Sequence, residues 1–161
     1  MQSAGYLTPQ AHEFEITKGE FTMIQVITGK RGSGKTKILL GMIDDAVKVS
    51  NGDIICIEKC MKLTYSVNHK VRLVDAERYN ISGFDMFYGF VAGVLAGNYD
   101  IKEVFVDGIL KIGGRNYEEL GALLEKLDIL TGDDVHMIFT VSEDNDSLPE
   151  AVLKYLIPQA D

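Results

Sequence analysis

The stretch Phe21-Thr-Met-Ile-Gln-Val-Ile-Thr28 runs directly into Gly29-Lys-Arg-Gly-Ser-Gly-Lys-Thr36, and the rest of the chain is interpreted from this junction. The first part has the continuous apolar character of a buried strand, and the second fits the phosphate-binding pattern G-x-x-x-x-G-K-[ST] at every fixed position. Its glycines allow successive backbone N–H groups to curl around an anion, because no Cβ restricts their dihedral angles. Residues 37–48 carry apolar side chains at helical spacing, which predicts a helix that begins inside the loop.

The glycine-rich loop is predicted to hold the phosphates of ATP together with Mg²⁺. The residues assigned to nucleotide binding are Gly29, Lys30, Arg31, Gly32, Ser33, Gly34, Lys35, Thr36 and Lys37. Lys35 is expected to reach the β- and γ-phosphates and is also assigned to catalysis, whereas the Thr36 hydroxyl is expected to bind the metal ion. A flexible glycine-rich turn is the alternative, but strand, loop and helix follow one another in the order that the motif requires.

The composition is that of an ordinary globular protein, with 161 residues, 46% of them hydrophobic and 25% charged. We predict one nucleotide-binding domain over residues 23–161. Residues 1–22 are polar and irregular, and are interpreted as an extension, introduced by cloning or encoded upstream, or as an edge strand. The net charge of −8 argues against nucleic acid as a partner, because most of the surface would repel a phosphate backbone.

The two cysteines favour a reducing compartment. Cys56 lies within an apolar run and Cys60 follows four residues later, with no matching Cys/His pair that would complete a zinc site. The longest apolar run, residues 86–97, is too short to span a bilayer, and no segment has the pattern of a signal peptide. These features together predict a cytoplasmic protein.

Alternating apolar and turn segments predict an α/β fold. Strands are expected at residues 21–28, 54–57, 71–74, 102–107 and 135–141. Helices are expected after the glycine-rich loop, at residues 84–97, after a capping box of Asn116 and Glu119, and from near Ser147 to about Ile157. Residues 108–115 are predicted to be a loop. This order is typical of a doubly wound, mostly parallel five-stranded sheet with helices on both faces.

The predicted helix Phe84–Gly97 carries glycine at every fourth position, at 89, 93 and 97. Each glycine destabilises a helix by about 1 kcal/mol relative to alanine, so the repeat suggests that another backbone packs closely on that face. Two alternatives remain open: the helix packs on the sheet through this face, or the face forms a homodimer interface.

Acidic residues follow three of the predicted strands. The carboxyl ends of parallel strands meet at one edge of a sheet, so Glu58, Asp75 and Asp107 are expected near the phosphate loop. Asp107 is assigned to the metal with Thr36, and Glu58 is the candidate catalytic base. Gly108 stands where many ATPases have a catalytic glutamate, which predicts slow hydrolysis.

Other polar residues near the predicted strand ends are further candidates for contact with the phosphates. Lys111 and Arg115 follow Asp107 and could fold over the phosphates or reach a neighbouring subunit. Thr140 and Ser142, at the end of the fifth strand, are candidate γ-phosphate sensors, with ordinary hydrogen bonding as the alternative.

Through Gly29–Thr36 and Val104–Asp107, the chain resembles the P-loop NTPase superfamily. From Met23 onward it is also similar to small uncharacterised bacterial ATP-binding proteins, some labelled as twitching-motility-type ATPases. That similarity rests on the segments T-G-K-R-G-S-G-K-T, F-D-M-F-Y-G-F and V-F-V-D-G-I-L-K-I. The resemblance implies a nucleotide-binding fold over about 140 residues.

Three functions are compatible with the sequence. The first is an ATP-Mg²⁺ binding protein with slow or partner-stimulated hydrolysis, which acts as a nucleotide-dependent regulatory or interaction module. The second is a small-molecule kinase of the nucleoside type, and the third is a non-catalytic subunit that bound nucleotide stabilises.

Overall fold

The computed structural model describes residues 22–63 and 66–158. The expected extension, apart from Thr22, therefore lies outside the described residues. Within these two ranges, none of the helices has both the length and the apolar character needed to cross a membrane.

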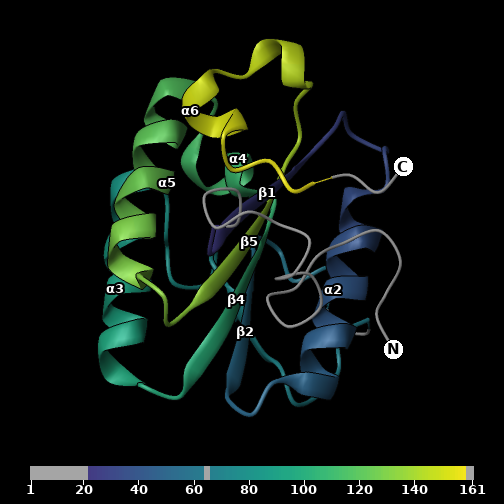
Figure 1. The fold of residues 1–161 in the computed structure, drawn as a ribbon, viewed down its shortest axis with the longest axis vertical. Coiled ribbons are helices and arrows are strands. Elements are labelled where there is room, and N and C mark those ends of the chain that lie inside the picture. Colours follow the sequence, from purple (N-terminus) through teal and green to yellow (C-terminus); the bar gives the residue numbers. More distant parts are fainter. Residues whose placement is uncertain (1–21, 64–65, 159–161) are drawn as a thin grey trace.

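A five-stranded sheet forms the centre of the structure (Figure 1). Its strands, in chain order, are β1 (Ile24–Thr28), β2 (Asp53–Glu58), β3 (Arg72–Asp75), β4 (Ile101–Asp107) and β5 (His136–Val141). Their spatial order is β1-β5-β4-β2-β3, and all four neighbouring pairs are parallel. The predicted fold class is therefore confirmed, and the sheet is parallel throughout the described residues.

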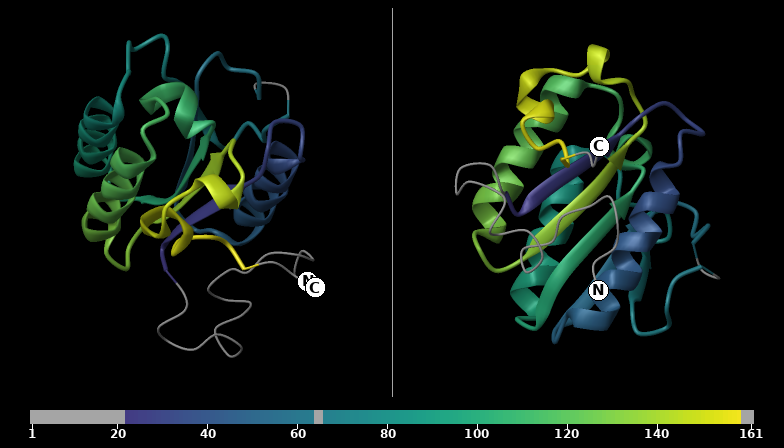
Figure 2. Two further views of the ribbon diagram at one scale, coloured as in Figure 1. Left: turned by 90° about the horizontal axis from the view of Figure 1, so that it is seen from above. Right: turned by 45° about the vertical axis from the view of Figure 1, so that its right-hand side comes forward.

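Helices cover both faces of the sheet (Figures 1 and 2). They are α2 (Lys35–Val49), α3 (Phe84–Gly97), α4 (Ile109–Gly113), α5 (Tyr117–Thr131) and α6 (Glu150–Leu153). On one face, α2 packs through Leu39 and Ile43 against a cluster that includes Phe105 of β4. On the opposite face, α3 and α5 pack against a second cluster that includes Val104 and Val106 of the same strand.

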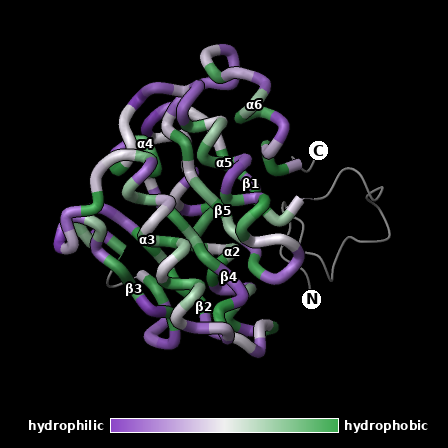
Figure 3. The backbone as a smooth tube through the Cα atoms, turned by 90° about the vertical axis from the view of Figure 1, so that its left-hand side faces the viewer, coloured by the Kyte–Doolittle hydropathy of each residue, from purple (hydrophilic) through white to green (hydrophobic). Residues whose placement is uncertain are grey.

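The alternation along β4 explains why the strand sequences are apolar without interruption. Successive strand residues point to opposite faces, so Val104 and Val106 enter one core and Phe105 enters the other. Both faces are covered, and a strand in such a sheet has no solvent-facing side. In Figure 3 the central strand segments are coloured as hydrophobic, whereas many of the surrounding loop segments are hydrophilic.

Two predicted boundaries were wrong. Residues 108–115 were expected to form a loop, but the short helix α4 begins at Ile109, directly after the left-handed Gly108. The last helix was expected to run from near Ser147 to about Ile157, but α6 has four residues. The chain then pairs with the outer edge of β1, through bonds between Val26 and the backbone of Tyr155 and Ile157. Pairing with an edge strand competes with continued helix and satisfies backbone groups that β1 would otherwise expose.

The glycine face of α3 does not pack on the sheet. The helix buries Phe84, Phe87 and Val91, whereas a Cβ built on Gly89 or Gly93 would meet nothing within 4 Å. The alternative in which this face packs on the sheet was therefore wrong, and the homodimer interface stays a prediction.

Candidate functional site

The loops that follow β1, β2, β4 and β5 lie at the same end of the parallel sheet, the upper end in Figure 1. The loop after β1 has positive φ angles at Gly29, Gly32 and Gly34, of 147°, 84° and 94°. Such angles are readily adopted only by glycine, which explains the glycine spacing in the sequence. Gly34 is the N-cap of α2, so the helix begins at Lys35, as predicted.

The Lys35 side chain folds back into the loop. Its Nζ donates a hydrogen bond of 3.0 Å to the carbonyl oxygen of Lys30, and the residue is 7% exposed. Burial lowers the pKa of Lys35, and the nearby Asp107 carboxylate opposes that shift. The loop therefore holds an ammonium group close to its own backbone, at the position where the motif requires one.

Thr36 and Asp107 come together from α2 and β4. The Thr36 hydroxyl lies 3.3 Å and 3.4 Å from the two carboxylate oxygens of Asp107. In an octahedral Mg²⁺ site with ligands at 2.0–2.1 Å, adjacent oxygen ligands lie about 3 Å apart. A hydroxyl and a carboxylate at this separation fit Mg²⁺ in both ligand chemistry and spacing.

A third residue fixes the orientation of the Asp107 carboxylate. Thr140, which is 1% exposed on β5, donates a 2.7 Å hydrogen bond to Asp107 Oδ1. The same Thr140 oxygen accepts a 2.7 Å hydrogen bond from the backbone N–H of Gly108. Thr140 therefore contacts the acidic residue itself, whereas Ser142 contributes only a carbonyl oxygen, which accepts from Arg115 at 3.4 Å.

Glu58 lies beside Asp107, but its carboxylate is already engaged. The two residues are paired in register on β2 and β4, and Glu58 is 4% exposed. Its Oε1 accepts a 2.9 Å hydrogen bond from the Leu63 N–H. Burial raises the pKa of Glu58, and the neighbouring Asp107 carboxylate adds to the rise. Burial together with these two carboxylates also raises the pKa of Cys56 to about 12, which keeps that thiol protonated.

Asp75 closes a turn on the other side of β2. Its Oδ1 accepts hydrogen bonds from the backbone N–H groups of Cys60, at 3.2 Å, and Glu77, at 2.9 Å. This carboxylate therefore orders the loops that follow β2 and β3.

The start of the glycine-rich loop is tied to the segment after β5. The Gly29 N–H donates to the carbonyl oxygen of Glu143 at 3.0 Å, and the ammonium of Lys30 pairs with Asp144 at 3.2 Å. The remaining loop positions assigned to nucleotide, Arg31, Gly32, Ser33 and Lys37, are exposed. The loop is thus anchored at its beginning and open at its tip.

Arg115 is engaged with the same segment. Its guanidinium group donates to Glu143 Oε2 at 3.2 Å and to the Tyr117 hydroxyl at 3.0 Å, and that hydroxyl donates to Glu143 at 2.6 Å. Contact of Arg115 with a phosphate would require these bonds to break. Lys111 differs, because its stem lies over Gly108, next to the candidate metal ligand.

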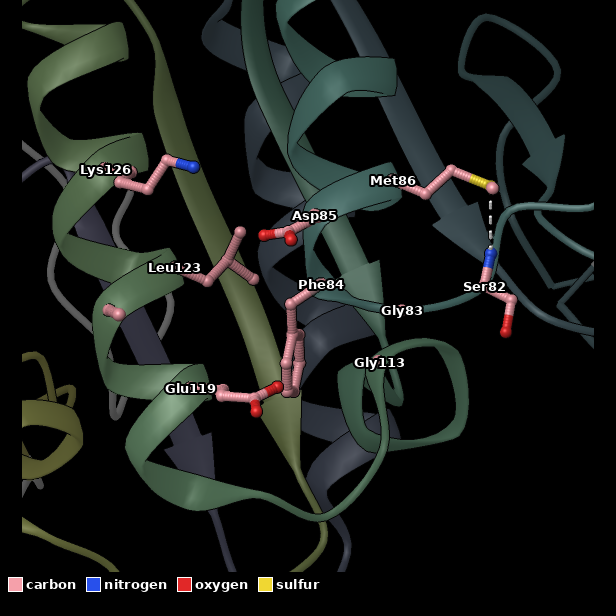
Figure 4. Close-up of a pocket in the computed structure, with 10 residues that line it drawn as sticks. Ser82, Gly83, Phe84, Asp85, Met86, Gly113, Glu119, Leu123 and Lys126 are labelled. Carbon is pink, nitrogen blue, oxygen red and sulfur yellow. Dashed lines mark hydrogen bonds between the residues drawn. The ribbon is translucent and has the colours of Figure 1, made fainter.

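The pocket drawn in Figure 4 lies elsewhere. It has a volume of about 580 Å³ and opens between the start of α3 and α5, with Phe84, Asp85 and Lys126 in its lining. None of the glycine-rich loop residues lines it. The candidate phosphate site is instead the exposed glycine-rich loop at the start of α2, and the start of a helix is a place where backbone N–H groups are available to an anion.

Sequence reasoning missed how two of these residues act. Thr140 was treated as a possible phosphate sensor, although its position beside β4 in the sheet would have allowed a bond to Asp107. The Glu143 carbonyl oxygen accepts from the Gly29 N–H because a turn after β5 brings the two residues together. No local sequence pattern predicts that contact.

The described residues form a parallel α/β sheet, and a strand, a glycine-rich loop and a helix follow one another at Gly29–Thr36, as in the P-loop motif. Comparison with solved structures finds the flagellar accessory protein FlaH from Methanocaldococcus jannaschii, with a TM-score of 0.54 and 16% sequence identity. The match covers 81% of this chain and 64% of that chain. At 16% identity, the likeness concerns the fold alone. No protein-family model matches the chain, and a search of curated proteins finds no match.

Proposed function

We propose that this chain binds ATP with Mg²⁺ and hydrolyses it slowly, or only when a partner stimulates the reaction. The bound nucleotide would then control an association with that partner. The observation that carries the proposal is the convergence of Lys35, Thr36 and Asp107 at the end of β1 and β4. A buried ammonium beside a hydroxyl–carboxylate pair is the arrangement needed for a triphosphate and its metal ion.

Each group has a defined part in this proposal. The backbone N–H groups of the loop would bind the phosphates, and the Lys35 ammonium would leave the Lys30 carbonyl oxygen for a phosphate oxygen. Thr36 and Asp107 would hold the Mg²⁺, which supplies positive charge that stabilises the transferring phosphoryl group. Thr140 would keep the Asp107 carboxylate turned toward Thr36.

The expectation of slow turnover comes from the residues around Asp107. Gly108 offers no carboxylate to orient a water molecule, and the candidate base Glu58 is bonded to the Leu63 N–H. For Glu58 to accept a proton from water, its carboxylate must be ionised and accessible, and burial disfavours both. A partner that displaces the loop after β2 would expose this carboxylate and raise the rate.

The test is phosphate release from ATP and Mg²⁺, measured on purified wild type, Lys35→Ala and Glu58→Gln with and without candidate partner proteins. We expect slow release by wild type and loss of release in Lys35→Ala. Glu58→Gln should keep nucleotide binding and lose turnover, because glutamine preserves the bond to Leu63 but cannot accept a proton.

Lys48→Ala is the matched control, because Lys48 lies exposed in the last turn of α2, away from the loop. Wild-type turnover in Glu58→Gln would exclude Glu58 as the base. Nucleotide binding with no turnover under any condition would favour the non-catalytic subunit instead.

A further inference from the structure

The turn after Asp107 places a second lysine over the site. Gly108 has a φ of 77° and caps α4, and the Lys111 N–H donates to its carbonyl oxygen at 2.9 Å. This turn folds the Lys111 stem back across the glycine. A Cβ built on Gly108 would lie 3.4 Å from Lys111 Cδ, 3.7 Å from Cγ and 3.9 Å from Cε. The lysine stem thus lies beside Gly108, at van der Waals distance from the position of a Cβ.

The positive charge of Lys111 acts on both reactive neighbours of Asp107. Burial lowers the pKa of Lys35, the Asp107 carboxylate opposes that shift, and the Lys111 ammonium adds a smaller lowering. Burial raises the pKa of Glu58, and the same ammonium opposes that rise. The Lys111 ammonium therefore lies within electrostatic range of Lys35 and Glu58, and its stem lies beside Gly108.

Among the described residues, no carboxylate forms a salt bridge with Lys111, which is exposed. The Lys35 and Lys111 ammonium groups repel each other, and the Asp107 carboxylate offsets this repulsion at Lys35. An anion that bridges Lys35 and Lys111 would remove this repulsion.

We propose that Lys111 is a second phosphate-binding lysine, whose ammonium contacts the terminal phosphate of a nucleoside triphosphate held by the Gly29–Thr36 loop. The inference rests on the proposed function, because it requires a nucleotide in that loop. The φ of 77° at Gly108, which residues with a side chain rarely adopt, makes the turn that brings the Lys111 stem to this position.

The consequence is discrimination between triphosphate and diphosphate. The Gly29–Thr36 backbone would contact phosphates that both nucleotides carry, whereas a contact to the terminal phosphate would exist only in the triphosphate. A hydrogen bond between charged groups contributes about 1.5–3 kcal/mol, which corresponds to a factor of about 10–150 in affinity.

The test is isothermal titration of the Mg²⁺ complexes of ADP and of adenosine 5′-(β,γ-imido)triphosphate, which is resistant to hydrolysis. Wild type, Lys111→Met and Lys111→Arg are compared, with Lys48→Ala as the control for loss of one exposed lysine. Methionine keeps the apolar stem over Gly108 and removes the charge, whereas arginine keeps the charge.

We expect Lys111→Met to weaken triphosphate binding about tenfold or more and ADP binding less than about twofold. Lys111→Arg should retain most of the preference for triphosphate, and Lys48→Ala should bind as wild type. An unchanged ratio of the two affinities in Lys111→Met would overturn the assignment while leaving the proposed function intact. Failure of wild type to bind either nucleotide would overturn both.

Discussion

The Thr140 hydroxyl donates a 2.7 Å hydrogen bond to the Asp107 carboxylate and accepts one of the same length from the Gly108 N–H. Because the Gly108 N–H supplies the proton on one side, the hydroxyl proton must point at Asp107. The carboxylate is thereby held from β5, while Thr36 approaches it from α2. The metal-ligand candidates are therefore positioned by three separate elements.

This contact predicts that Thr140→Val will weaken Mg²⁺ binding in the nucleotide complex by about 10–100-fold, the usual effect of removing a partner that orients a ligand. Valine matches threonine in shape but cannot hold Asp107 or satisfy the Gly108 N–H. Mg²⁺ titration of the nucleotide-bound protein measures the loss. Thr140→Ser should restore most of the affinity, and a Thr140→Val protein with wild-type Mg²⁺ affinity would contradict the assigned role.

Gly113 and Gly93 should respond to alanine in opposite directions. A Cβ on Gly113 would lie 2.0 Å from Phe84 Cε1, at the pocket margin seen in Figure 4, so Gly113→Ala should destabilise the fold by about 1–3 kcal/mol. Gly93 faces open space on α3, and Gly93→Ala should stabilise the helix by about 1 kcal/mol. Urea unfolding of both variants measures the two effects.

The same variants also test the predicted homodimer. If the glycine face of α3 joins two chains, Gly93→Ala should weaken self-association in sedimentation equilibrium even though it stabilises the isolated helix. A wild-type chain that remains monomeric at all concentrations would exclude that interface.

The buried Glu58 predicts a pH effect with a definite sign. Its folded-state pKa is raised above the ordinary 4.5 by burial, so the folded state holds the proton more tightly than the unfolded chain. The resulting stability is fully present below pH 4.5 and is lost as pH rises through the folded-state pKa. As the pH increases through the folded-state pKa of Glu58, wild type should lose stability relative to Glu58→Gln, which does not titrate. Urea unfolding at a series of pH values measures the difference. A constant difference between the two proteins at every pH would refute this account of Glu58.

The fold was predictable because its signals are local and repeated. Five apolar strand segments, the glycine spacing at Gly29–Thr36 and the Asn116 cap each specify their own backbone, and Asn116 Oδ1 does accept the Glu119 N–H at 3.1 Å. The end of the chain was predicted poorly because Tyr155 and Ile157 pair with β1, which is distant in sequence. Tertiary pairing of this kind overrides a local helix signal.

The candidate site was predictable only as far as the parallel sheet dictates. Strand ends must meet, so the proximity of Glu58 and Asp107 follows from the topology. The side-chain partners cannot be predicted from the topology. The hydrogen bond from the Leu63 N–H to Glu58 and the position of the Lys111 stem beside Gly108 both depend on loop conformations. Such conformations are specified by packing rather than by residue spacing.

The central claim is that Gly29–Thr36 binds ATP with Mg²⁺, and isothermal titration of wild type and Lys35→Ala tests it most directly. We predict saturable binding by wild type that weakens when Mg²⁺ is removed. Lys35→Ala should bind at least about tenfold more weakly, through loss of a charged hydrogen bond. Absence of binding by wild type, or equal affinity in folded Lys35→Ala, would contradict the claim.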